Sequence, residues 1–179
     1  MSLSTQIAGA VKDYTAQRVA LTSKKSIKDV LAALDVEVNK EGGRANTLRI
    51  IANAQTKEEL EAGMDELTKG GKLDFVLFAT FSHSRWLAIY LGREFPETHV
   101  YIIGNPLIAQ TMLQHDIAAG LHIPPKLLVT EIEGGKGTTV VFDLPSSVIA
   151  VGNNVSPELK KAAEGLDEKL ERLVRKVLS

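Results

Sequence analysis

The 179-residue chain contains no cysteine, which excludes disulfides, a thiolate nucleophile, a zinc-thiolate site and a thiol redox switch. Aromatic residues make up only 5% of it, and no basic cluster accompanies them, so a stacking platform for single-stranded nucleic acid is not predicted. Neither sign of charge is in excess, because 21 basic residues stand against 22 acidic ones. No long-range field therefore favours nucleic acid or an anionic membrane as a partner.

Long hydrophobic runs are also absent. The longest, Phe75 to Phe81, is far shorter than the ~20 residues that cross a bilayer as a helix. The N-terminal segment MSLSTQIAGAVKDY lacks the basic start and the continuous apolar core of a secretory signal, so we expect a cytoplasmic protein. The length and the 44% hydrophobic content predict a single domain over residues 1–179.

The common signatures of cofactors and catalysis are missing too. Gly135-Lys136-Gly137 is the only Gly-x-Gly triplet, and Val140 stands where a dinucleotide loop would have its third glycine. The chain has no His-Glu-x-x-His pair and no Gly-x-Ser-x-Gly elbow. The sequence therefore names no cofactor.

Periodicity and capping residues predict most of the secondary structure. Ser26, Thr56 and Ser156 are typical N-caps, and Asn105-Pro106 is a typical helix start after a buried strand. We expect helices at 26–39, 56–69, 107–114 and 156–178, a short helix at 86–91, and strands at 14–22, 73–81, 100–103, 126–132 and 138–142. Residues 48–52 fit a strand or a helical turn, and residues 146–152 fit a short helix or a strand.

The segment from Val100 to Pro145 reads VYIIGNPLIAQTML, then HDIAAGLHIPPKLLVTE, then a Gly-rich turn and VVFDLP. This order resembles the domain of unknown function 302 family, whose motif positions are matched here by Gly104, Asn105, Pro106, Pro125, Glu131, Asp143 and Pro145. The resemblance implies an α+β fold, a single domain with helices packed on a largely antiparallel or mixed sheet, and brings no established activity. The family-like core would span about 14–150, with the helix at 56–69 inserted and the C-terminal helix added.

The turn from Gly104 to Ile108 is the first candidate site. A helix N-terminus offers free N–H groups and a positive dipole end to an anion, and here Leu107 and Ile108 would supply donors beside Asn105. We therefore expect Gly104, Asn105, Leu107 and Ile108 to bind a ligand. The alternative is that Asn105 only caps the helix.

His83 and Arg85 follow the strand at 75–81 directly. If that strand runs parallel to the one at 100–103, both side chains lie at the same sheet edge as the Gly104 turn. Arg85 could then hold a carboxylate or phosphate, and His83 could move a proton near neutral pH. The alternative is that Arg85 meets a surface acid and His83 has a structural role.

Three further features could each have a functional or a purely structural role. His115, Asp116 and His122 carry metal-ligand chemistry, but their spacing is not diagnostic and no third ligand lies near the two histidines, so we predict no metal site. The apolar stripe of the final helix fits either the domain's own core or a coiled-coil seam. Trp86 fits an anchor in the core or in an interface better than a ligand platform.

These observations predict a small-molecule binding protein, with anionic ligands included, that self-associates as a homodimer through the final helix or a sheet edge. One alternative is an enzyme in which His83 is the acid or base, while Arg85 and the Gly104 to Ile108 turn orient an anionic substrate. Another is a protein-interaction module that uses the C-terminal helix. Neither nucleic acid nor a membrane is an expected partner.

Overall fold

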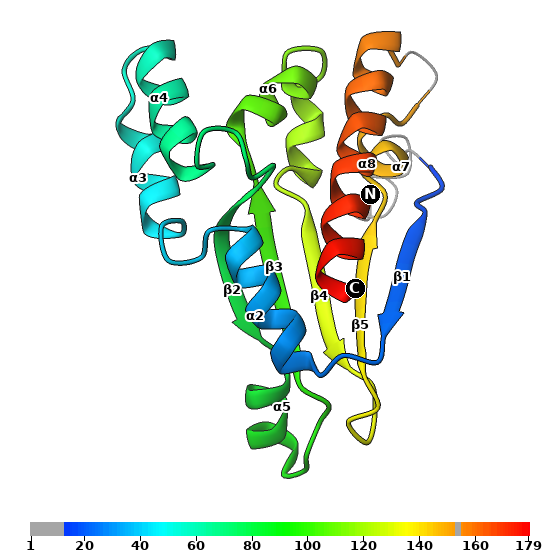
Figure 1. Ribbon diagram of the computed structural model, residues 1–179. Coiled ribbons are helices and arrows are strands. Elements are labelled where there is room, and N and C mark those ends of the chain that lie inside the picture. The colour runs from blue at the N-terminus through cyan, green and yellow to red at the C-terminus, as the bar shows by residue number, and fades with distance from the viewer. Residues whose placement is uncertain (1–12, 153–154) are drawn as a thin grey trace, which may run out of the picture.

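The computed structural model describes residues 13–152 and 155–179, so the N-terminal segment examined for a signal lies largely outside the described residues. A five-stranded sheet forms the centre of a single domain, with helices on one of its faces (Figure 1). The strands are β1 (Arg18–Ser23), β2 (Val76–Ser82), β3 (Thr98–Gly104), β4 (Lys126–Glu131) and β5 (Thr138–Asp143). The helices are α2 (Ile27–Glu37), α3 (Ala45–Asn53), α4 (Lys57–Leu67), α5 (Ser84–Leu91), α6 (Pro106–Leu113), the 3-10 helix η1 (Ile117–His122), α7 (Pro145–Ile149) and α8 (Pro157–Leu178).

The sheet has the order β1-β5-β4-β3-β2, and every neighbouring pair is antiparallel. This confirms the predicted α+β class and the hairpin of β4 and β5. One irregularity interrupts β2, where the register shifts between Leu77 and Ala79 and leaves Phe78 outside the regular pairing. Such a bulge redirects the side chain it carries.

The predicted caps begin the predicted helices. Ser26, Thr56, Asn105 and Ser156 each accept a hydrogen bond from a backbone N–H of the first turn. The two ambiguous segments are both helical, as α3 and α7. The N-cap residue of α3 is Arg44, whose side chain makes no capping bond. The local signal that marks helices α2, α4, α6 and α8 is therefore missing there.

The main core lies between the sheet and helices α2, α6, α7 and α8. Eight side chains of α8 are buried: Leu159, Ala163, Leu166, Leu170, Leu173, Val174, Val177 and Leu178. The C-terminal stripe therefore belongs to the chain's own core. These buried side chains are not available to a partner, so an interaction module that uses this helix would have to use its charged face.

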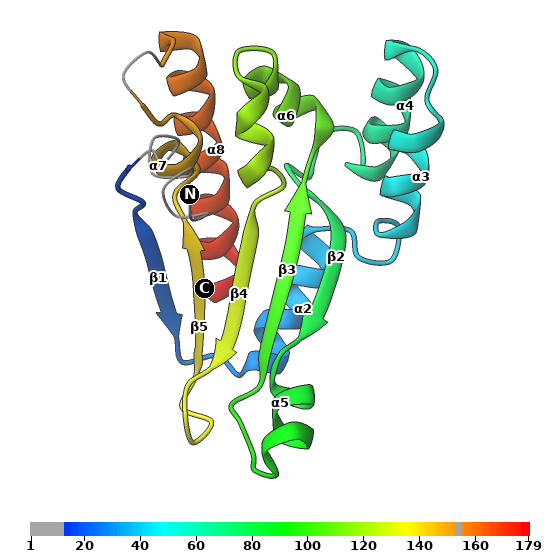
Figure 2. The same cartoon turned by 180° about the vertical axis from the view of Figure 1, so that it is seen from behind.

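Helices α3 and α4 form a lobe beside β2 with a small core of its own (Figures 1 and 2). Met64 and Leu67 of α4 pack there on Val76, and Phe78 and Leu107 contact the same cluster. We call this unit the α3–α4 lobe. It stands apart from the main core, and the space between the two holds the candidate site.

The other face of the sheet carries no helix among the described residues, as the view from behind shows (Figure 2). The register places one uncharged row across all five strands of this open face: Ala20, Val141, Leu128, Val100 and Phe81. Helix α5 follows β2 with no buried residue, and its Ile89 and Tyr90 are 77% and 80% exposed. The open face thus carries one apolar row, beside a row of threonines, and α5 exposes further apolar side chains next to it.

Candidate ligand-binding site

The Gly104-Asn105-Pro106 turn leads from β3 into α6 at the upper end of the sheet. Asn105 fixes the turn on both sides, because its side-chain oxygen accepts from the Leu107 N–H at 2.9 Å and its Nδ2 donates to the Asp74 carbonyl at 3.3 Å. Gly104 is needed for close packing, since a Cβ there would lie 3.1 Å from Pro124 and 3.2 Å from Phe78. The turn is therefore rigid and tightly enclosed.

The donors expected to bind an anion at this turn already have acceptors. The Leu107 N–H donates to the Asn105 side chain, and the N–H groups of Ile108 and Ala109 donate to the Asn105 carbonyl at 3.0 and 2.9 Å. An anion would have to displace these bonds. The capping role of Asn105 is confirmed, and the turn offers packing surface rather than free donors.

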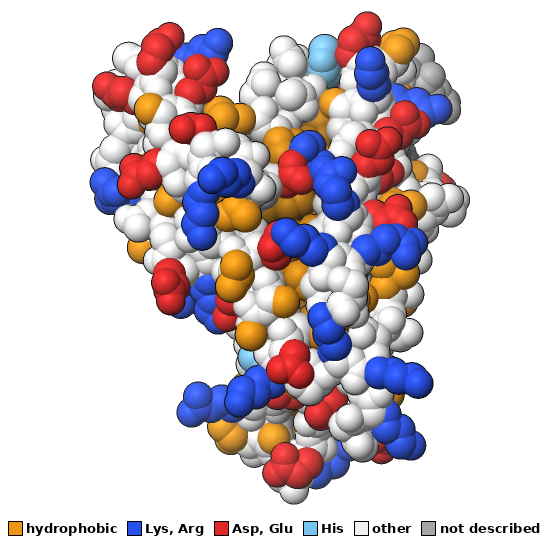
Figure 3. Space-filling model, viewed as in Figure 1, with side chains coloured by type: hydrophobic (Ala, Val, Ile, Leu, Met, Phe, Trp, Pro, Cys, Tyr) orange, Lys and Arg blue, Asp and Glu red, His pale blue; other side chains and the backbone are white. Residues whose placement is uncertain are grey.

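Beneath the turn lies a cavity of about 470 Å³, which we call the apolar cavity. Its volume falls in the range of small-molecule sites. It is bounded by the α3–α4 lobe, the ends of β2 and β3, α6, the Ile123-Pro125 segment and α8. Its apolar lining includes Ile51, Phe75, Phe78, Ile108, Met112, Leu113, Ile123, Pro124 and Leu166. Hydrophobic side chains gather visibly between the lobe and helices α6 and α8 (Figure 3).

Polar groups are few around this cavity. Asn105 is committed to the turn, and Gln110 and Gln114 lie on exposed positions of α6 and its end. Of the four predicted ligand residues, Gly104, Asn105 and Ile108 line the cavity, whereas Leu107 packs on the core of the lobe. The chemistry of this space favours an apolar molecule held by contact area rather than by charge.

Helix α8 is tied to this end of the sheet by Asp74. Its carboxylate pairs with Lys169 and, at 2.9 Å, with Arg172, while its carbonyl receives the Asn105 side chain. Partial burial acts to raise the pKa of Asp74, but the hydrogen bonds from the two basic groups outweigh it and hold that pKa below its ordinary value. Arg172 of α8 therefore pairs with Asp74 at the start of β2.

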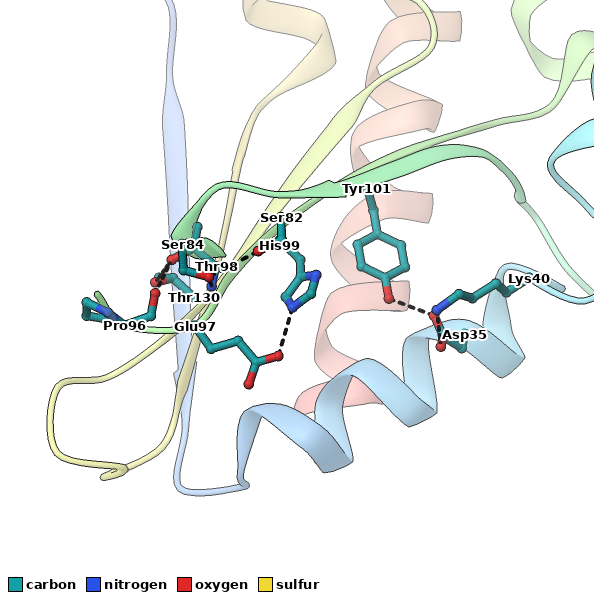
Figure 4. Close-up of polar contacts among 10 residues, drawn as sticks. All are labelled: Asp35, Lys40, Ser82, Ser84, Pro96, Glu97, Thr98, His99, Tyr101 and Thr130. Carbon is teal, nitrogen blue, oxygen red and sulfur yellow. Dashed lines mark hydrogen bonds and ion pairs between the residues drawn. The ribbon is translucent and has the colours of Figure 1, made fainter. Parts of the chain in front are cut away.

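A second and larger hollow, of about 990 Å³, opens on the other side of Phe78, and we call it the polar cleft. Asp35 of α2 lies in its wall, where it accepts from the Tyr101 hydroxyl at 2.6 Å and pairs with Lys40 at 2.6 Å (Figure 4). Burial and the hydrogen bond to Asp35 raise the pKa of Tyr101 well above its ordinary value. The phenol thus keeps its proton and is a fixed hydrogen-bond donor to Asp35, which is also paired with Lys40.

His83 and Arg85 lie at the opposite end of the sheet from the Gly104 turn. The expected parallel pairing is wrong, because β2 and β3 are antiparallel and place Val76 opposite Gly104 but Ser82 opposite His99. Six residues of extended strand separate the two ends by about 20 Å. One substrate cannot bridge them, so the predicted assembly of His83, Arg85 and the turn is not formed.

At its end of the sheet, His83 packs with two aromatic side chains, Phe81 and Trp86. Its Nδ1 accepts from the Trp86 Nε1–H at 3.3 Å, and its ring meets Phe81 and Trp86 edge to face. Arg85 is exposed and forms no ion pair with the described residues. His83 thus links the open face to α5.

The residues weighed as metal ligands also have local roles. Asp116 caps η1 by accepting from the Ala118 N–H at 2.9 Å, and His122 Nε2 lies 3.4 Å from the Tyr14 hydroxyl. Within residues 13–152 and 155–179, no three His, Asp or Glu side chains are grouped as a metal would require. In the same part of the chain, no helix is long and apolar enough to span a membrane.

Sequence reasoning missed most of the apolar cavity. Phe75, Phe78 and Leu166 come from three distant segments, and only the folded chain brings them together. One local signal was available, because Ile108 and Met112 are four apart in a predicted helix and so lie on the same face. The bulge that turns Phe78 toward the cavity has no signature in the sequence.

Comparison with known proteins finds a family and a solved structure that are similar to this chain. The model of the family described as "Domain of unknown function DUF302" matches residues 55–177. A crystal structure of an uncharacterized conserved DUF302 protein from Bacillus stearothermophilus is similar, with a TM-score of 0.61 and 16% sequence identity over 90% of this chain and 98% of that chain. No curated protein matches this chain. At such low identity the likeness shows the fold alone.

Proposed function

The chain belongs to the DUF302 family, a family of unknown function, and we propose from its own side chains that it binds a small, mainly apolar molecule. The observation that carries the proposal is the apolar cavity of about 470 Å³. Ligand sites are concave and largely apolar, and this one is walled by helices and strand ends around the Gly104 turn. In this proposal Gly104, Asn105 and Ile108 act as wall and scaffold of the site.

A cavity-filling variant tests this proposal. Ala109 of α6 lines the cavity, so Ala109→Leu places three additional carbons inside it. Ala62→Leu makes the same change on the exposed side of α4 and serves as the matched control. We expect 1-decanol, followed by the methyl NMR signals of Ile108 and Met112, to bind the wild type and the control alike. Ala109→Leu should weaken that binding at least about tenfold. Equal binding by all three proteins would refute the site.

Self-association is a second proposal, and it rests on the open face and α5. The sheet alone presents about 480 Å², taking its five strands at ~4.8 Å spacing and about 20 Å length, which is below the ~800 Å² per partner of a standard interface. Helix α5 supplies further apolar area through Ile89 and Tyr90. We infer that a second copy of this chain covers the open face and α5. Its identical uncharged row would leave no charge unpaired at the centre of the interface.

The margins of the open face agree with this inference. Arg18 and Asp143 neutralise each other at 2.7 Å, and Lys126 is long enough to reach water from the edge. Sedimentation equilibrium should give a dimer mass for the wild type and a monomer mass for the double variant Ile89→Ser, Tyr90→Ser. Leu121→Ser, at an equally exposed position of η1, should leave the dimer intact. A monomeric wild type would overturn the proposal.

Two expectations from the sequence stay predictions: a cytoplasmic location and the lack of a nucleic-acid partner. Cell fractionation tests the first, and filter binding with mixed single-stranded DNA tests the second.

A further inference from the structure

The polar cleft and the apolar cavity share one wall. Phe78, turned out of the regular strand pairing by the bulge, lines both hollows. Helix α3 also borders both, since Leu48 lies in the cleft and Ile51 in the cavity. Leu48 and Ile51 are three residues apart and so share one face of the helix, and Arg44 is the N-cap residue directly before it. From Arg44 and Leu48 in the polar cleft to Ile51 in the apolar cavity, the lining changes from charged to apolar.

More basic than acidic side chains line the polar cleft. Three basic side chains line it, Lys40, Arg44 and Lys69, against two acidic ones, Asp35 and Glu41. Asp35 and Lys40 neutralise each other. Arg44 and Lys69 form no ion pair with the described residues, and both are exposed in the cleft. Two cations against the single free carboxylate of Glu41 leave room for an anion.

The backbone holds these side chains in unusual conformations. Asn39, Arg44 and Lys69, with φ of 46°, 50° and 56°, are left-handed non-glycine residues, and all three line the cleft. Glycine adopts such angles without steric cost, so a turn alone would not require these side chains. The Arg44 N–H donates to the Leu77 carbonyl at 2.6 Å, which fixes the residue to β2 beside Phe78. This bond therefore fixes the backbone of Arg44 in the wall of the cleft.

We propose that the ligand is an amphiphilic carboxylate, whose head group binds Arg44 and Lys69 in the polar cleft while its hydrocarbon tail passes Phe78 into the apolar cavity. This proposal rests on the proposed function, because the tail occupies the same cavity. The guanidinium can pair with a carboxylate through two hydrogen bonds, and the Lys69 ammonium adds a second charge. Since the whole chain has a net charge of −1, any preference for an anion must arise locally.

Two probes of equal chain length separate the head group from the tail. Decanoate and 1-decanol are titrated at neutral pH and low salt, below the micelle concentration, into the wild type and into Arg44→Gln, Lys69→Gln and the double variant. Arg49→Gln, on the same helix but outside the cleft lining, is the matched control. Charge-assisted pairing predicts that the wild type and Arg49→Gln bind decanoate at least about tenfold more tightly than 1-decanol.

The double variant should bind both probes equally, with its affinity for 1-decanol unchanged. Added salt should reduce the preference of the wild type, because the head group is near the surface. Equal binding of the two probes by the wild type would overturn the head-group site and leave the proposed function standing. The head-group site would also be overturned if the double variant kept the preference for decanoate over 1-decanol, or if Arg49→Gln lost it equally. Failure of both probes to bind the wild type would refute the apolar cavity itself.

Discussion

Gly104 shows how much one residue controls at this site. A methyl group there would press on Pro124, in the segment between η1 and β4, and on Phe78 at the bulge of β2. We expect Gly104→Ala to lower the free energy of unfolding by about 1–3 kcal/mol, the usual effect of overpacking. Chemical denaturation measures the change.

The same substitution elsewhere provides the control for that measurement. A Cβ at Gly165, inside α8, would meet no atom within 4 Å. Gly165→Ala should therefore raise the free energy of unfolding by roughly 0.5–1 kcal/mol through helix propensity. Opposite signs for the two variants are the expected result, and a destabilised Gly165→Ala or a neutral Gly104→Ala would contradict the packing described.

Single residues were predictable from the sequence where their role is local. Asn105 was expected either to cap α6 or to bind a ligand, and its capping bond is a short-range contact that neighbouring residues determine. The roles of His83 and Arg85 depended on the direction of β2 relative to β3, which no residue near them specifies. Arg44 and Lys69 carry no signal in the local sequence, because positive φ and a shared cleft arise only in the folded chain.

At the scale of elements, Asp74 is the contact that fixes α8 to the start of β2. Its folded pKa lies below the ordinary value of 3.8, so its contribution to stability is present above that pH and is lost as the pH falls through the folded pKa. Asp74→Asn should cost about 1 kcal/mol near neutral pH, the scale of a partly exposed ion pair. The difference from the wild type should shrink below pH ~4.

Urea unfolding of both proteins across a pH series measures this difference. Glu133→Gln, in the exposed hairpin loop and without an ion pair to the described residues, controls for the loss of one negative charge. A wild-type advantage that stays constant down to acid pH would show that Asp74 acts by packing and not through its charge.

The elements themselves were largely predictable, because caps and periodicity act within a few residues. Helices α2, α4, α6 and α8 all begin at side-chain caps that the sequence displays. Helix α3 has no such cap and is short, so its segment fitted a strand as well as a helical turn. Its helical state depends on packing against α4 and β2, which is tertiary information.

At the scale of the whole molecule, the two cores differ greatly in size. The main core joins the sheet to four helices, whereas the small core of the α3–α4 lobe consists, among the described hydrophobic residues, of buried Met64 and Leu67 packed on Val76 of β2. The sequence could not reveal this division, because strand order and the position of the lobe depend on contacts between distant segments. The proposed binding site lies where the two cores meet, so its walls belong to parts of unequal stability.

This division predicts how the molecule opens. Backbone amides in a unit with little buried apolar surface exchange through local opening, so α3 and α4 should exchange with deuterium well before β3, β4 and α8. A ligand that spans the lobe and the main core stabilises only the closed form, and decanoate should therefore slow exchange in α3 and α4 selectively. Hydrogen exchange followed by mass spectrometry resolves these segments. Uniform exchange across both cores, or protection by decanoate confined to α5 and the open face, would place the weakest unit or the ligand elsewhere.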